Sequence, residues 1–165
     1  MIEYDVPRIC LNGHLVGFDF VSPIRPGLNQ KADPFCERCG QPAIVQCPAC
    51  NSEITRHTLT LASDAHRAHE VPSFCRRCGK PYPWTERRLQ AARELIDLEQ
   101  TLAPDEKAAL KTDIQDIAHD APRTRAASIR IKNALATVSG ALGSALRDII
   151  VNVASEAAKK TILGP

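Results

Sequence analysis

The segment CERCGQPAIVQCPAC, residues 36–50, contains two Cys-x-x-Cys pairs joined by a short β-like run. Such a pair supplies two thiolates from one tight loop, and a tetrahedral zinc ion needs four ligands. Gly40 and Asn51 directly follow the two pairs and suit the backbone turn that aims both sulfurs at one point. The segment therefore indicates two zinc-binding knuckles, each of which needs a partner elsewhere in the chain.

Two more candidate knuckles lie outside this segment. Downstream is Cys75-Arg-Arg-Cys78, again followed by a glycine, and upstream is Cys10-Leu-Asn-Gly-His14, which offers one sulfur and one imidazole nitrogen. Pairing the knuckles in sequence order leaves hairpin-length loops between partners, as a zinc ribbon requires. The first site then has the ligands Cys10, His14, Cys36 and Cys39, and the second site has Cys47, Cys50, Cys75 and Cys78.

Two other ligand arrangements are compatible with the spacing. The knuckles can pair in a cross-braced way, the first with the third and the second with the fourth. His14 can also be a surface histidine, with His57 or His66 completing the first site. All these sites are closed, whereas a catalytic zinc keeps one position for water. We therefore expect two structural zinc ions that supply folding free energy to a module with a small core.

The composition narrows the class of protein. Seven cysteines, an odd number, fit a complete disulfide framework poorly. The first residues lack a basic start followed by an apolar run, so no secretory signal is expected, and reduced thiols then favour the cytoplasm. The longest uncharged run, residues 133–146, is too short to span a bilayer. A net charge of +2 gives the chain as a whole no strong field toward nucleic acid.

The composition changes near Trp84. All seven cysteines precede it, whereas Ala, Leu, Ile, Glu and Lys at helical spacing follow it. Three segments are predicted: a double zinc ribbon over 1–85, a two-helix segment over 86–121 and a long amphipathic helix over 122–165. The expected fold class is a small zinc-stapled β module followed by an all-α C-terminal half.

Local signals place the two shorter helices. Thr85 is the expected cap of a helix that runs from about Glu86 to Leu102. Pro104 suits the first turn of a second helix, which stops before Pro122.

The predicted C-terminal helix, from about Arg123 towards Lys160, has an apolar stripe that one small ribbon can scarcely cover. Small residues that would let a second helix approach closely are Ser139, Gly140, Gly143 and Ser144. We favour self-assembly or docking on a partner as the role of this helix. The alternatives are packing back onto the two shorter helices and lying in a membrane surface.

Several stretches together resemble a known family. They are VPRICLNGH at 6–14, FCERCG at 35–40, QCPACN at 46–51, PSFCRRCGKPYPWTE at 72–86, DAPRT at 120–124 and ASEAAKK at 154–160. In this order they resemble a bacterial family of double zinc-ribbon proteins long labelled uncharacterised, over nearly the whole chain. Such proteins look like the zinc-finger ribonucleases of antiphage defence, which are switched on by docking on large ring-shaped phage assemblies. The resemblance therefore implies a ribonuclease.

Cleavage of RNA without a metal needs a general base for the 2′-hydroxyl and an acid for the leaving oxygen, and histidine serves both near neutral pH. No motif of a nuclease superfamily occurs, so the candidates come from the loop between the third and fourth knuckles. We select His66 and His69 as the acid–base pair, with His57 nearby in sequence and Arg67 or Arg56 to stabilise charge on phosphorus. The alternative is a solvated loop without a catalytic role.

A basic cluster with interleaved aromatic residues begins at the fourth knuckle. Its members are Arg76, Arg77, Lys80, Tyr82, Trp84, Arg87 and Arg88. Basic side chains bind phosphates and aromatic faces stack unpaired bases, so the cluster is a candidate RNA-binding surface. In the alternative, Tyr82 and Trp84 pack the ribbon onto the first helix and the arginines are only solvated.

Three hypotheses of function follow. In the first, the protein is a zinc-ribbon effector of antiphage defence that binds or cuts RNA and assembles, or docks on a large phage assembly, through its C-terminal helices. In the second, it is a non-catalytic adaptor for protein or nucleic acid. In the third, it acts on membrane surfaces through its amphipathic helix. Whether the protein is an enzyme stays open.

Overall fold

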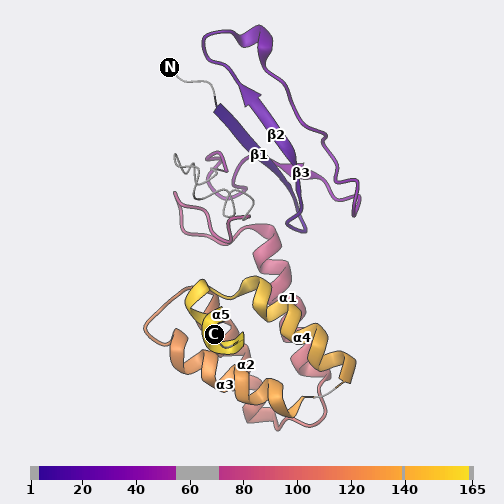
Figure 1. The fold of residues 1–165 in the computed structure, drawn as a ribbon, viewed down its shortest axis with the longest axis vertical. Helices are drawn as coiled ribbons and strands as arrows, with labels where there is room; N and C mark the ends of the chain where they lie inside the picture. The colour runs from indigo at the N-terminus through magenta and orange to yellow at the C-terminus, as the bar shows by residue number, and fades with distance from the viewer. Residues whose placement is uncertain (1–3, 55–70, 139, 164–165) are drawn as a thin grey trace. The chain divides into compact units, whose positions relative to one another are not determined.

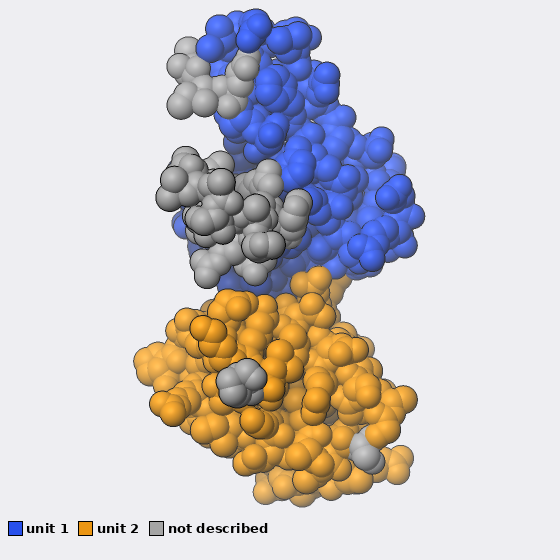
Figure 2. Space-filling view, viewed as in Figure 1, with its two compact units in different colours: residues 1–86 blue, residues 87–165 orange. Residues whose placement is uncertain are grey.

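The computed structural model describes residues 4–54, 71–138 and 140–163. The chain divides into two compact units, residues 1–86 and residues 87–165, which Figure 2 distinguishes by colour. The first unit holds a small antiparallel sheet and the cysteine knuckles, and the second consists of helices (Figure 1).

The sheet of the first unit has three strands in the order β2-β1-β3. Strands β1 (Tyr4–Cys10) and β2 (Leu15–Val21) form a hairpin, and β3 (Ala43–Ile44) pairs with the end of β1 (Figure 1). Gly13 turns the hairpin at a φ of 84°, a left-handed value that favours glycine. The register shifts between Arg8 and Ile9, so a bulge lies just before the first cysteine ligand candidate.

A partly buried ion pair fixes the chain that follows β2. Arg8 donates two hydrogen bonds to Asp19, at 2.9 and 2.6 Å, and the backbone N–H of Ala32 donates to the same carboxylate at 3.0 Å. The short 3₁₀ helix η1 (Pro26–Leu28) lies in the intervening loop. Desolvation alone would raise the pKa of Asp19. The hydrogen bonds from the Arg8 guanidinium and the Ala32 N–H outweigh this effect and hold the pKa of Asp19 below its usual range.

The core of the first unit is small and consists largely of residues at the knuckles. Its buried members are Ile9, Cys47, Ile54, Cys75, Tyr82 and Trp84, with Leu15, Ile44, Cys50 and Val71 packed against them. The rings of Tyr82 and Trp84 stack with their centroids 4.6 Å apart. Trp84 Nε1 also donates to the Pro72 carbonyl at 2.8 Å. A core of this size supports a fold only with additional cross-links.

Five α-helices follow in the described part of the chain. They are α1 (Pro83–Leu98), α2 (Pro104–Ala118), α3 (Thr124–Thr137), α4 (Gly140–Val153) and α5 (Glu156–Leu163). The buried side chains of the second unit come from all five of these helices and include Ile96, Leu110, Ile114, Ile131, Leu135, Leu146, Ile150 and Ile162. Arg130 of α3 donates to the buried Asp113 of α2, with Nε 2.7 Å from Oδ2, and this pair holds the two helices in register. The C-terminal half is therefore all-helical, as predicted.

The prediction of one long C-terminal helix is wrong. The chain breaks between α3 and α4, where Val138 is extended and Gly140 has a φ of 73°, and again before Ser155. At the second break the Ser155 N–H leaves the helical ladder and donates to the Ile117 carbonyl of α2 at 2.8 Å. The physical reason is burial: three short helices can fold the apolar stripe back onto α1 and α2, whereas one straight helix cannot.

The small residues of this region have a role inside the chain. A Cβ at Gly143 would lie 2.5 Å from the carbonyl oxygen of Val138, so the turn between α3 and α4 packs directly on the glycine. Gly140 provides the left-handed turn residue. Ser144 is exposed, and Ser139 lies outside the described residues. The glycines thus serve close packing between α3 and α4.

Helix α1 also differs from its prediction. It begins at Pro83, so Thr85 lies inside the first turn, where its hydroxyl donates to the Ser73 carbonyl at 2.8 Å. It ends at Leu98 because the Glu99 carboxylate accepts hydrogen bonds from the N–H and hydroxyl of Thr101, at 2.9 and 2.8 Å, and closes a turn. Helix α2 begins at Pro104 and ends before Pro122, as predicted. None of the described helices combines the length and apolar character needed to cross a membrane.

Candidate metal centres

The three Cys-x-x-Cys knuckles have the same backbone hydrogen bonds. In each, the N–H of the residue after the second cysteine donates 2.8 Å to the carbonyl of the first cysteine, from Gly40, Asn51 and Gly79. The N–H of the first cysteine in turn donates to the carbonyl one residue further on, at 2.9, 2.8 and 2.8 Å. Each knuckle is thus a closed turn whose two cysteines point to the same side.

The residue after each pair adopts a left-handed conformation. The φ values are 69° at Gly40, 57° at Asn51 and 71° at Gly79. Glycine and asparagine are the residues that tolerate this region best, which is why they occur at this position in the sequence. The sequence signal at these three positions therefore has a direct structural cause.

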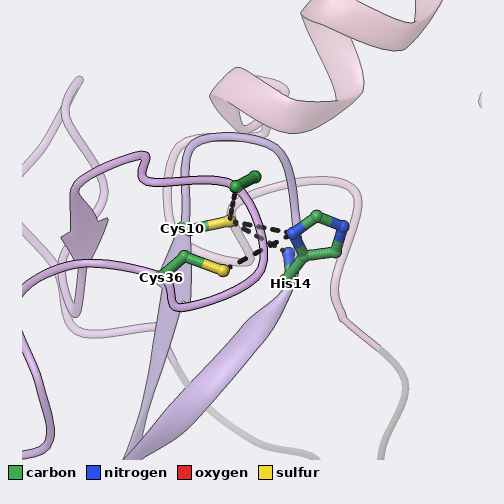
Figure 3. A group of neighbouring side chains, drawn as sticks. Cys10, His14 and Cys36 are labelled. Carbon is green, nitrogen blue, oxygen red and sulfur yellow. Dashed lines mark hydrogen bonds between the residues drawn. The ribbon is translucent and has the colours of Figure 1, made fainter.

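The first site gathers one sulfur and one imidazole from the β1–β2 turn and two sulfurs from the second knuckle. Cys10 Sγ lies 3.6 Å from His14 Nδ1 and 3.7 Å from Cys39 Sγ, and Cys36 Sγ lies 3.6 Å from the same nitrogen. Figure 3 shows the Cys10 and Cys36 sulfurs and the His14 ring facing one another. The four ligand atoms are all within 4.8 Å of one another.

The second site gathers four sulfurs from the third and fourth knuckles. Cys47 Sγ lies 3.8 Å from Cys78 Sγ, and Cys50 Sγ lies 3.7 Å from Cys75 Sγ. The Ser52 hydroxyl lies 3.1 Å from Cys50 Sγ and 3.3 Å from Cys75 Sγ, so its single hydrogen can be donated to either thiolate. All four sulfurs are again within 4.8 Å of one another.

These distances fit tetrahedral zinc. A zinc–sulfur bond of about 2.3 Å places two sulfurs of a tetrahedron about 3.8 Å apart, and a zinc–nitrogen bond of about 2.0 Å places nitrogen and sulfur about 3.5 Å apart. A disulfide would instead need the sulfurs about 2.0 Å apart. The chain therefore has two separate four-ligand groups of the kind that hold structural zinc, one of three sulfurs and an imidazole and one of four sulfurs.

The pairing is sequential. The first site joins the first and second knuckles, and the second site joins the third and fourth. The cross-braced arrangement is thereby excluded, and His14 occupies the position for which His57 or His66 was the alternative. Both sites have their four ligands from the protein, so neither offers the open position that a catalytic zinc needs.

Hydrogen bonds favour the thiolate form of several ligands. The N–H of Gln41 is the main cause that lowers the pKa of Cys39, to about 6. The Ser52 hydroxyl is the main cause that lowers the pKa of Cys75, to about 5. Because zinc binds the thiolate and competes with protons for it, both shifts favour metal binding at neutral pH.

Ser52 is a functional residue that the sequence reasoning missed. It follows the third knuckle at the position that Gln41 and Lys80 occupy after the second and fourth knuckles. The sequence shows a hydroxyl residue just after the third knuckle, and this could have identified Ser52, because residues next to metal ligands commonly donate hydrogen bonds to them.

The structure divides the predicted RNA-binding cluster into two sets. Tyr82 and Trp84 are only 2% and 1% exposed, and each ring stacks on the other. They therefore form the core of the first unit and have no free face on which a base could stack. The basic members are accessible: Arg76, Arg77, Lys80 and Arg87 are exposed, and Arg88 is half-buried.

The predicted catalytic residues His57, His66, Arg67 and His69, together with Arg56, lie outside the described residues. The flanking residues on both sides belong to the first unit. Ile54 is a buried member of its core, and Val71 packs against that core.

Two closed sulfur-rich sites on turns around a small β hairpin, followed by a separate helical unit, define a double zinc-ribbon protein with a helical C-terminal half. A comparison with known protein families gives a match over nearly the whole chain. A family model described as an uncharacterized protein conserved in bacteria (DUF2321) matches residues 3–162, and the chain belongs to that family. No curated protein and no solved structure matches the chain.

Proposed function

We propose that this protein is a zinc-ribbon effector of bacterial antiphage defence that binds RNA through its fourth knuckle and cuts it with the histidines that precede that knuckle. The defence role rests on the family resemblance of the sequence. The RNA contact rests on one observation, the difference in charge between knuckles that share a single backbone geometry.

The three knuckles provide an internal comparison. The two residues between the cysteines are Glu37 and Arg38 in the second knuckle and Pro48 and Ala49 in the third. In the fourth they are Arg76 and Arg77, and the residue two positions after Cys78 is Lys80, where the others have Gln41 and Ser52. The backbone requires none of these cations, because the same turn forms without them.

Three exposed cations on one rigid turn suit the RNA backbone. Arg76, Arg77 and Lys80 lie within five residues of one another beside the second metal site. Phosphate neutralisation by Lys and Arg dominates affinity for single-stranded nucleic acid, and it carries no sequence information. Since Tyr82 and Trp84 are buried, the proposed contact is to phosphates, and it tolerates any base sequence.

Cleavage is assigned to the segment between the third and fourth knuckles. His66 and His69 are the proposed base and acid, with Arg67 stabilising the charge that develops on phosphorus and His57 as a further candidate. Attack of the 2′-oxygen on phosphorus releases the 5′-oxygen of the next nucleotide and leaves a 2′,3′-cyclic phosphate. Both metal sites are closed, so this route needs no zinc-bound water.

The helical unit is the proposed sensor. It is a compact unit that contributes no ligand to either metal site, so the proposed docking on a phage assembly, or on another copy, uses residues apart from those sites. The membrane alternative is less favoured, because most of the predicted apolar stripe is buried, at Ile131, Leu135, Val138, Leu146 and Val153. The non-catalytic adaptor hypothesis differs from this proposal in one result: an adaptor would bind RNA without cleaving it.

RNA binding is tested by the salt dependence of affinity. Fluorescence anisotropy with a single-stranded RNA should show log Kd rising linearly with log salt concentration. The double variant Arg77→Gln/Lys80→Gln should lower that slope by about 1.4, since each lost contact to a single strand contributes about 0.7. Arg38→Gln is the matched control, because Arg38 occupies the equivalent position of the second knuckle. Equal slopes for both variants would overturn the assignment.

Cleavage is tested on the zinc-loaded full chain, alone and with purified ring-shaped phage assemblies. We expect RNA products that end in a 2′,3′-cyclic phosphate, and no cleavage by His66→Ala or His69→Ala proteins that still bind RNA. If the wild-type chain binds RNA but leaves it intact under every condition, the protein is an adaptor and the catalytic part of the proposal fails.

A further inference from the structure

The eight metal ligands differ in their access to solvent. In the first site Cys10 and Cys36 are buried, and His14 and Cys39 are half-buried. In the second site Cys47 and Cys75 are buried and Cys50 is half-buried, whereas Cys78 is exposed. Cys78 is therefore the one residue of the two ligand groups that is exposed to solvent.

The hydrogen bonds to sulfur add to this difference. The second cysteine of each knuckle accepts a backbone N–H from the residue two positions on, Gln41 for Cys39, Ser52 for Cys50 and Lys80 for Cys78. The His14 N–H also donates to Cys10 Sγ at 3.3 Å in the first site, and in the second site the Ser52 hydroxyl lies beside the Cys50 and Cys75 sulfurs. A donated hydrogen bond withdraws electron density from a thiolate and makes it a weaker nucleophile. Cys78 accepts the Lys80 N–H but, among the described residues, has no hydroxyl beside it as Cys50 and Cys75 have.

The side chains around Cys78 favour attack on a peroxide. Arg76, Arg77 and Lys80 are exposed in the same turn. When a thiolate attacks a peroxide oxygen, the other oxygen leaves with a negative charge, and nearby cations stabilise that charge. The same three cations were assigned to RNA phosphates above, but their effect on the sulfur does not depend on RNA.

We propose that Cys78 is a peroxide-reactive thiolate whose oxidation opens the second metal site while the first stays intact. The Sγ attacks one oxygen of hydrogen peroxide, an S–O bond forms, and the O–O bond breaks. The departing hydroxide takes a proton to become water. Sulfur loses two electrons to the peroxide, and Cys78 becomes a sulfenic acid.

The second step uses the neighbouring ligand Cys47. Its sulfur lies 3.8 Å from Cys78 Sγ, close enough to attack the sulfenic sulfur after a small movement. An S–S bond forms, and the sulfenic oxygen leaves as hydroxide, which a proton converts to water. Only Cys50 and Cys75 then remain as ligands, and a structural site with two ligands cannot hold its metal.

The first site is less open to this route. Its sulfurs of Cys10 and Cys39 are 3.7 Å apart, so a disulfide is geometrically accessible there too. Neither sulfur is exposed, however, and Cys10 is buried. The distinguishing consequence is order: the second site opens first.

The test follows zinc release and thiol oxidation in the zinc-loaded full chain. Hydrogen peroxide is added, freed zinc is measured with a chromogenic chelator, and remaining thiols are alkylated and mapped by mass spectrometry. We expect one zinc equivalent to be released at least about tenfold faster than the other, together with a Cys47–Cys78 disulfide. The three cysteines of the first site should still be alkylated at that point. Dithiothreitol with added zinc should restore the starting state.

Cys78→His replaces the reactive sulfur with an imidazole and gives the second site the ligand set of the first. In this variant the fast phase should slow to the rate of the slow phase. The mapping of the wild-type chain stands even where this variant binds zinc poorly. Release of both zinc ions at one rate, or oxidation that begins at Cys10, Cys36, Cys39, Cys50 or Cys75, would overturn the proposal.

Discussion

At the scale of single residues, the chemistry of this protein depends on which atoms face each metal. His14 reaches the first site through Nδ1 because the turn at Gly13 brings it back over Cys10, whose carbonyl accepts the Gly13 N–H at 2.8 Å. Ser52 reaches the second site from the residue after a knuckle. These two side chains make the sites different although three of the four knuckles share a backbone.

Replacement of His14 tests the first site. His14→Ala should reduce bound zinc from two to one equivalent per chain, because three sulfurs cannot complete a tetrahedron. His14→Cys should keep both equivalents, since it recreates the four-sulfur set of the second site. Zinc is measured by elemental analysis after exhaustive dialysis, with His119→Ala, at the exposed residue that follows α2, as the control. Retention of two zinc ions by His14→Ala would mean that another residue completes the site.

Removal of the Ser52 hydroxyl tests the second site. The hydroxyl lowers the pKa of Cys75 to about 5, so Ser52→Ala should raise that pKa and strengthen competition by protons. We expect zinc affinity of this site to fall about 10- to 100-fold, and acid to release its zinc at a higher pH than in the wild type. Chelator competition at several pH values measures both. Ser52→Thr keeps a hydroxyl and should behave as the wild type does, whereas a loss from the first site would contradict the assignment.

At the scale of elements, short helices replace the single long helix that periodicity suggests. The sequence from 124 to 163 keeps its apolar spacing through both breaks, but Gly140 and Ser155 redirect the chain. The Ser155 N–H to Ile117 carbonyl bond and the Arg130–Asp113 pair then tie α3 and the start of α5 to α2. The apolar stripe that suggested a partner helix is thereby covered within the unit.

Gly143 is the sharpest test of this arrangement. Gly143→Ala would place a methyl group 2.5 Å from the Val138 carbonyl oxygen, a backbone atom that moves only with its turn. We expect the helical unit to lose about 1 to 3 kcal/mol of stability, as for other overpacked positions. Urea unfolding followed by circular dichroism at 222 nm measures it. Ser144→Ala, at the adjacent exposed position, should change stability by less than about 0.5 kcal/mol. Equal effects of the two would argue against the packing of α3 on α4.

At the scale of the whole molecule, the two units are stabilised by different means. The first unit has a core of a few side chains around two metal sites, and the second buries aliphatic residues from each of the described helices α1 to α5. Their stabilities should therefore respond to different treatments. The single tryptophan, Trp84, is buried in the core of the first unit and reports on that unit alone.

Metal removal should unfold one unit and spare the other. A strong zinc chelator should shift the fluorescence of Trp84 to longer wavelength, because the structural metals supply folding free energy to a core that cannot fold alone. The ellipticity at 222 nm should stay largely unchanged, since the helical unit holds no metal ligand of either site. Added zinc should reverse the fluorescence change. Parallel loss of both signals would show that the helices depend on the ribbon.

What the sequence by itself determined were features that depend on local chemistry. The Cys-x-x-Cys spacing, the left-handed residue after each pair and the start of α2 at Pro104 all follow from interactions within a few residues. So do the ribbon-then-helix order and the sequential pairing of knuckles, because short loops join partners that are neighbours in the chain.

What only the tertiary structure decided were contacts between distant residues. The periodicity of the sequence shows which residues of α3 and α4 are apolar. It does not show that the chain turns at Gly140, so that the apolar residues of α3 and α4 are buried within one unit. In the sequence Tyr82 and Trp84 lie among arginines, which suggested an RNA-binding surface. In the structure both rings are buried, because the small core of the first unit needs large side chains to fill it. Exposure likewise distinguishes Cys78 from its three companions, because solvent access depends on how the whole unit packs around a sulfur rather than on its neighbours in sequence.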